Sequence, residues 1–186
     1  VNVHYFADMM EAHVKRRARP RVVISDERGA LLETGGGFAR ARSKLGAAPV
    51  FCTNTDAILV DEGRDEACRR LAQAFDQKTM DALLLLAPMD RTSGFDGAGD
   101  FDLSADGALR WRSGASAAYA FTGLQIINPA LADGAPEGAF SMRVLWDKAA
   151  KAGRFRGLVH KGWWMHVGDP EGLAAAERRL EALGAD

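Results

Sequence analysis

Cysteine is scarce in this sequence: Cys52 and Cys68 are the only two among 186 residues. One pair is a poor basis for the disulfide framework of a small secreted protein, and its spacing matches no zinc or redox motif. We therefore expect two reduced thiols in a cytoplasmic protein.

Long apolar runs and an excess of one charge are also missing. The longest apolar run, residues 82–88, has the length of a buried strand and falls far short of the roughly 18 residues of a membrane helix. The formal net charge is -1, which predicts no general affinity for nucleic acid or for an acidic membrane surface. Hydrophobic residues make up 47%, enough for a core without disulfides or a structural metal, and the length fits a single domain over residues 1–186.

What the sequence does contain is an alternation of strand and helix patterns. We predict strands over residues 1–4, 21–25, 50–53, 82–86, 119–127, 155–160 and 163–167, with a hairpin over 101–112. Helices are predicted over residues 7–17, 38–45, 64–75, 143–152 and 170–183. This order predicts an α/β fold, with a layered sheet and crossover helices.

A run of three glycines, Gly35 to Gly37, precedes the helix predicted from Phe38. Glycines at the start of a helix let backbone N–H groups approach an anionic ligand closely. The alternative is a tight turn in which Thr34 is the N-cap of that helix. Neither the Walker pattern nor the dinucleotide fingerprint is present, so the residues alone leave both interpretations open.

Two further side chains, Asp56 and His166, stand at the ends of predicted strands. Ligands of open α/β sheets gather beyond the carboxyl ends of strands, and magnesium takes one or two carboxylates with phosphate oxygens and water. Asp56 is therefore a candidate metal ligand, with a turn or capping residue as the alternative. For His166 the alternative is a packed or hydrogen-bonded histidine.

Taken in order along the chain, five segments resemble one known family. They are Leu32–Gly37, Asn54–Asp56, Gly99–Phe101, Phe121–Gly123 and Trp164–Gly168. They resemble the sugar-1-phosphate nucleotidyltransferases, in particular the branch of N-acetylmuramate-1-phosphate uridylyltransferases and mannose-1-phosphate guanylyltransferases. The resemblance spans nearly the whole chain, and Leu-Glu-Thr-Gly-Gly-Gly is its most specific part.

The resemblance implies a Rossmann-like three-layer α/β/α fold with a mixed central sheet. It also implies a reaction in which a sugar 1-phosphate oxygen attacks the α-phosphorus of UTP or GTP and pyrophosphate leaves, with Mg²⁺ or Mn²⁺ as cofactor. Carried over by position, the site residues are Asp56 as catalytic metal ligand with His166 at the second metal position, Glu33, Thr34 and Gly35 beside the base and ribose, and Gly99, Asp100, Thr122 and Gly123 in the sugar pocket.

Two departures from the family pattern affect these expectations. Many members carry aspartate in a Trp-x-Asp-x-Gly setting where this chain has His166, and imidazole suits softer transition metals better than magnesium. We expect His166 to bind magnesium weakly, to prefer manganese, or to act by hydrogen bonding alone.

The family's glycine-rich triphosphate loop, Leu-Ala-Ala-Gly-x-Gly-x-Arg-Met, and a later Lys-Pro have no counterpart in these residues. We therefore expect an amino-terminally incomplete domain with little turnover, which roughly 60 further residues would restore.

Other functions compete with this hypothesis. One is a non-catalytic nucleotide-sugar-binding or regulatory relative, which the absent loop and His166 would favour. Another is a metal-dependent phosphoesterase that uses Asp56 together with Asp61. The sugar (N-acetylmuramate, mannose or glucose) and the oligomeric state stay open.

Overall fold

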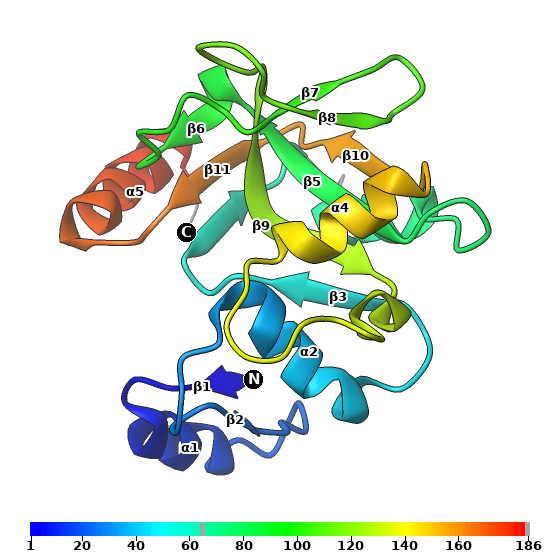
Figure 1. Ribbon diagram of the computed structural model, residues 1–186. Helices are drawn as coiled ribbons and strands as arrows, with labels where there is room; N and C mark the ends of the chain where they lie inside the picture. The colour runs from blue at the N-terminus through cyan, green and yellow to red at the C-terminus, as the bar shows by residue number, and fades with distance from the viewer. Residues whose placement is uncertain (64–65, 185–186) are drawn as a thin grey trace. The chain divides into compact units, whose positions relative to one another are not determined.

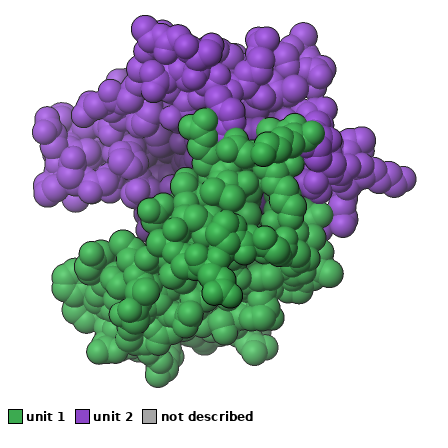
Figure 2. Space-filling model, viewed as in Figure 1, with its two compact units in different colours: residues 1–48, 128–151 green, residues 49–127, 152–186 purple. Residues whose placement is uncertain are grey.

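The computed structural model describes residues 1–63 and 66–184 (Figure 1). The chain divides into two compact units (Figure 2). Unit 1 comprises residues 1–48 and 128–151, and unit 2 comprises residues 49–127 and 152–186. Each unit is built from two separate stretches of the chain.

The main sheet of unit 2 mixes parallel and antiparallel pairs. Its strands are β3 (Val50–Thr53), β5 (Ala82–Pro88), β7 (Phe101–Leu103), β8 (Leu109–Trp111), β9 (Tyr119–Ile127) and β10 (Phe155–Val159). The order is β10-β5-β9-β7-β8, and β3 pairs with β9. Only the pairing of β10 with β5 is parallel within this order. The predicted α/β class with a mixed sheet is therefore confirmed.

Strand β5 forms the centre of the core of unit 2. Leu84, Leu85 and Leu86 are completely buried, as expected for an apolar run that is covered on both faces. Leu83 and Leu85 join a cluster with Leu71 of helix α3 (Ala67–Ala74). That helix was predicted over residues 64–75. Residues 64 and 65 lie outside the described part of the chain.

A second, smaller sheet in unit 2 contains β4 (Ala57–Val60), β6 (Thr92–Ser93) and β11 (Trp163–His166). Strand β11 runs antiparallel to β4 and parallel to β6. The 3-10 turn η1 (Met89–Arg91) leads into β6, and helix α5 (Pro170–Leu183) follows β11. The Asp169 side chain caps α5 by accepting a 2.7 Å hydrogen bond from the Gly172 N–H. Strands β4 and β6 were not predicted.

Unit 1 contains two short strands and the remaining helices of the described residues. Its elements are β1 (Asn2–Val3), α1 (Ala7–Lys15), β2 (Ser25–Asp26), α2 (Glu33–Leu45), η2 (Pro129–Ala132) and α4 (Arg143–Lys151). The strand predicted over 21–25 is wrong except at Ser25, because only Ser25 and Asp26 pair with β1.

The helix predicted from Phe38 begins at Glu33 instead, so all three glycines lie inside α2. Across the described residues, no helix combines the length and the apolar character that a membrane crossing requires.

Candidate functional site

Two of the predicted site residues, Asp56 and His166, meet in unit 2. His166 ends β11, and the antiparallel register pairs it with Ala57 at the start of β4. Asp56 directly precedes Ala57, and its carbonyl accepts a 2.8 Å hydrogen bond from the Val167 N–H. As a result Asp56 Oδ2 lies 3.3 Å from His166 Nε2, although 110 residues separate them.

The other ring nitrogen of His166 faces a backbone carbonyl. Nδ1 lies 3.3 Å from the oxygen of Gly94, the residue that follows β6. The Asp56 and His166 side chains are 42% and 36% exposed, so a ligand can reach both. The role of Gly94 was not predicted, since the sequence shows only a glycine in a loop.

The donor atoms of this pair fit a small divalent cation. At a ligand distance of about 2.1 Å, two donors of one ion lie about 3.0 to 3.4 Å apart, depending on the coordination angle. The described residues include no group of three or more His, Cys, Asp or Glu side chains that could hold a metal. Two protein donors are nevertheless enough for magnesium or manganese when phosphate oxygens and water complete the shell. The imidazole suits transition metals better than it suits magnesium.

Gly99 and Asp100 hold the start of β7 against β9. Gly99 has a φ of 82°, and a Cβ there would lie 2.5 Å from the Ala117 carbonyl oxygen, so only glycine fits. The Asp100 N–H donates a 2.7 Å hydrogen bond to the Tyr119 carbonyl, and Asp100 Oδ2 accepts a 2.9 Å hydrogen bond from the Phe121 N–H. Their predicted contact with the sugar stays a prediction.

Thr122 and Gly123 lie at an irregularity in the pairing of β9 with β5. Thr122 is completely buried, and its hydroxyl donates a 3.0 Å hydrogen bond to the Leu85 carbonyl. The Gly123 carbonyl accepts a 3.0 Å hydrogen bond from the Asn54 N–H, which fixes the segment that leads to Asp56. Gly123 thus helps to position Asp56; a sugar contact by either residue stays a prediction.

The residues predicted to contact the nucleotide lie in unit 1, at the start of α2; they are Glu33, Thr34 and Gly35. The N–H groups of Gly35 and Gly36 both donate to the Phe140 carbonyl, at 2.9 and 3.0 Å. These two N–H groups are therefore engaged within unit 1, and the open glycine loop expected from the sequence is absent from this described segment.

Thr34 is not the N-cap of α2, because Leu32 occupies that position. The Thr34 hydroxyl instead accepts a 3.0 Å hydrogen bond from the Met142 N–H. A Cβ at Gly35 would lie 2.6 Å from the Ser141 carbonyl oxygen. Close approach of the 138–142 segment therefore explains the glycine at this position, and a nucleotide contact stays a prediction.

Asp61, the second carboxylate of the phosphoesterase hypothesis, lies at the other end of β4 from Asp56. Five residues of extended chain span about 16 Å. Asp61 Oδ1 accepts a 2.8 Å hydrogen bond from the Ala67 N–H at the start of α3, and it lies 4.0 Å from Nδ1 of the buried His160. Burial lowers the pKa of His160. This environment gives Asp61 a structural role, and nothing in it supports a shared site with Asp56.

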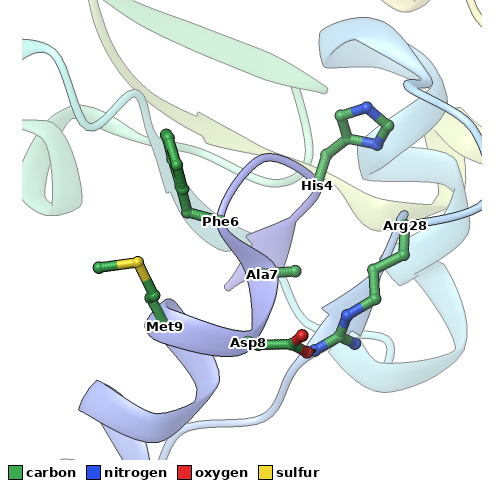
Figure 3. Close-up of a pocket in the computed structure, with 6 residues that line it drawn as sticks. All are labelled: His4, Phe6, Ala7, Asp8, Met9 and Arg28. Carbon is green, nitrogen blue, oxygen red and sulfur yellow. Dashed lines mark hydrogen bonds and ion pairs between the residues drawn. The ribbon is translucent and has the colours of Figure 1, made fainter.

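Unit 1 also contains a hollow of about 330 Å³, bordered by His4, Phe6, Asp8, Met9 and Arg28 (Figure 3). The Arg28 guanidinium points toward Asp8 and lies 2.8 Å from it, and an equal distance separates it from Glu11. Because these carboxylates already neutralise the cation, the hollow offers little attraction to a phosphate group. None of the predicted site residues borders it.

Comparison with known proteins provides an independent line of evidence. No family model matches the chain. The chain is similar to the N-acetylmuramate alpha-1-phosphate uridylyltransferase of Caulobacter vibrioides, with 44% identity over 185 residues. The match covers 97% of this chain and 76% of the relative.

Solved structures show the same fold at low sequence identity. HddC from Yersinia pseudotuberculosis matches with a TM-score of 0.71 and 18% identity over 96% of this chain and 76% of HddC. The inositol-1-phosphate CTP transferase of T. maritima matches with a TM-score of 0.72 and 12% identity, over 97% of this chain and 74% of the transferase. Both likenesses support the Rossmann-like α/β fold that the sequence predicts.

Proposed function

The chain belongs to the family of N-acetylmuramate α-1-phosphate uridylyltransferase, and we propose that it makes UDP-N-acetylmuramate from UTP and N-acetylmuramate α-1-phosphate. As a member of this family it is a sugar-1-phosphate nucleotidyltransferase, which forms a nucleoside diphosphate sugar. The choice of uridine and of N-acetylmuramate is supported by the 44% identity to the Caulobacter enzyme.

In the proposed reaction a phosphate oxygen of the sugar 1-phosphate attacks the α-phosphorus of UTP. A new oxygen–phosphorus bond forms, the bond between the α- and β-phosphates breaks, and pyrophosphate leaves. Little covalent chemistry is left to the protein, so catalysis depends on positioning and on stabilising the negative charge that develops on the phosphate oxygens.

We assign the divalent cation to Asp56 and His166, whose donor atoms lie 3.3 Å apart. When bound, Mg²⁺ or Mn²⁺ neutralises charge on the phosphate oxygens. Asp56 contributes a hard carboxylate donor, and His166 contributes an imidazole, which suits a transition metal such as Mn²⁺ better than Mg²⁺. The hydrogen bond from Asn54 to the Gly123 carbonyl and that from Val167 to the Asp56 carbonyl hold the carboxylate in place.

The remaining assignments rest on the sequence resemblance. We propose that Glu33, Thr34 and Gly35 contact the base and ribose. The sugar-contacting residues proposed are Gly99, Asp100, Thr122 and Gly123. Because the Thr122 hydroxyl is engaged inside the sheet, its contribution to a sugar contact would come from the backbone of this segment.

We place the reaction in the cytoplasm, where UTP is made, and its product among the precursors of the cell wall. Free thiols at Cys52 and Cys68 agree with a reducing compartment.

The test is a product assay with a matrix of substrates. The protein from its complete reading frame is incubated with UTP or GTP and with N-acetylmuramate, mannose or glucose 1-phosphate, in Mg²⁺ or Mn²⁺. We expect pyrophosphate and UDP-N-acetylmuramate to form fastest. Faster transfer from GTP or to mannose 1-phosphate would refute the substrate assignment. Nucleotide-sugar binding without turnover would point instead to a non-catalytic relative.

A further inference from the structure

We infer that Gly94, Gly168 and Gly172 are positioning residues that hold the His166 imidazole with Nδ1 toward the Gly94 carbonyl and Nε2 toward Asp56 Oδ2, so that Nε2 is the nitrogen that would bind the cation. The inference rests on the metal role proposed above for Asp56 and His166. It assigns the metal-binding nitrogen, which the sequence cannot do.

The two neighbours of the ring are both hydrogen-bond acceptors. The Gly94 carbonyl oxygen lies 3.3 Å from Nδ1, and Asp56 Oδ2 lies 3.3 Å from Nε2. Without a cation, Nε2–H can donate to the carboxylate, the stronger acceptor of the two. A cation held between Nε2 and Asp56 would need the lone pair of Nε2, so the ring proton would then lie on Nδ1, where the Gly94 carbonyl accepts it.

Glycines enclose His166 where any larger residue would displace it. A Cβ at Gly168 would lie 2.7 Å from ring atom Cε1 and 3.2 Å from Nε2. A Cβ at Gly172, in the first turn of α5, would lie 2.8 Å from the His166 carbonyl oxygen. A Cβ at Gly94 would overlap the same oxygen, and the φ of 69° at Gly94 already disfavours other residues.

Such neighbours commonly control metal affinity. A metal-ligating histidine usually donates its second ring N–H to a carbonyl or carboxylate, which fixes the tautomer and the ring orientation. Loss of such a partner typically weakens metal binding roughly 10- to 100-fold. The geometry at Gly94 and Gly168 is of this kind, since one glycine supplies the acceptor and the other leaves room for the ring.

The test is Mn²⁺ affinity by electron paramagnetic resonance, with thermal unfolding of the metal-free proteins as the folding control. Gly168→Ala and Gly172→Ala should bind Mn²⁺ roughly 10- to 100-fold more weakly. Gly114→Ala should match the wild type, because its Cβ would lie 3.9 Å from its nearest neighbour. Wild-type affinity in both Gly168→Ala and Gly172→Ala would contradict the inference, whatever the substrate of the enzyme. If the wild type itself binds no Mn²⁺, the proposed metal role and this inference both fail.

Discussion

Replacing Thr122 by valine separates a structural role from a role in sugar binding. The residue is completely buried on β9, and its hydroxyl donates a 3.0 Å hydrogen bond to the Leu85 carbonyl. The same oxygen accepts a 3.3 Å hydrogen bond from the Leu124 N–H. Valine has nearly the same shape but can form neither bond.

The expected cost in the free energy of unfolding follows from these two bonds. A net hydrogen bond contributes about 1 kcal/mol, and a buried donor left without an acceptor costs about 1 to 3 kcal/mol. These terms add to about 2 to 4 kcal/mol, and we expect Thr122→Val to lose about 2 kcal/mol, the lower end of that range, because the strand can relax. For a protein of this size that lowers the melting temperature by about 4 to 8 °C. Urea unfolding should show a lower midpoint with an unchanged slope.

Two variants serve as controls. Thr122→Ser retains the hydroxyl and should recover most of the lost stability. Thr53→Val, on the neighbouring strand β3, changes an exposed threonine and should alter stability by less than about 0.5 kcal/mol. If Thr122→Val were as stable as the wild type but had a raised KM for the sugar 1-phosphate, our account of its hydroxyl would be refuted.

Three further predictions concern the metal preference, the buried His160 and helix α2 of unit 1. His166→Asp should raise transfer in Mg²⁺ relative to transfer in Mn²⁺, and an unchanged metal preference in steady-state assays would argue against His166 as a ligand. Burial lowers the pKa of His160 from its ordinary 6.5, so the unfolded chain binds the proton more readily. Its contribution to stability is therefore present above pH 6.5 and lost as the pH falls from 6.5 toward the lowered pKa, by at most about 1.4 kcal/mol per pH unit. In His160→Gln the midpoint of urea unfolding should therefore change less with pH over this range. Gly35→Ala should cost about 1 to 3 kcal/mol in urea unfolding because its Cβ would lie 2.6 Å from the Ser141 carbonyl oxygen. Gly29→Ala, with nothing within 4 Å, should leave stability nearly unchanged.

Most of the fold in unit 2 could be predicted from local patterns. The leucine run of β5, the hairpin of β7 and β8, and helix α5 with Pro170 at its start all have strong local signals. Strand β4 was missed because it is stabilised by pairing with β11, about 100 residues away, and four apolar residues alone do not distinguish a strand from a buried turn.

The start of α2 shows where local propensity misleads. Glycine is a poor helix former, so three in a row predicted a loop before Phe38. The structure continues the helix through them because the 138–142 segment packs closely there and Phe140 accepts two of the N–H groups. That contact joins residues about 100 positions apart and leaves no local signal in the sequence.

The sequence named Asp56 and His166 as candidates but did not predict their geometry. Strand ends identified Asp56 and His166 separately, and the resemblance joined them. Only the antiparallel register of β4 and β11 brings the two side chains to 3.3 Å and aims the second ring nitrogen at Gly94.

We propose that Asp56 and His166 hold the metal ion of a sugar-1-phosphate nucleotidyltransferase. The most direct test follows radiolabelled UTP into UDP-N-acetylmuramate as Mn²⁺ is titrated into the wild type and into Asp56→Asn. We expect saturable, Mn²⁺-dependent transfer in the wild type and a loss of at least about 100-fold in the variant at every Mn²⁺ concentration. Equal transfer by the two proteins, with the same dependence on Mn²⁺, would contradict the claim.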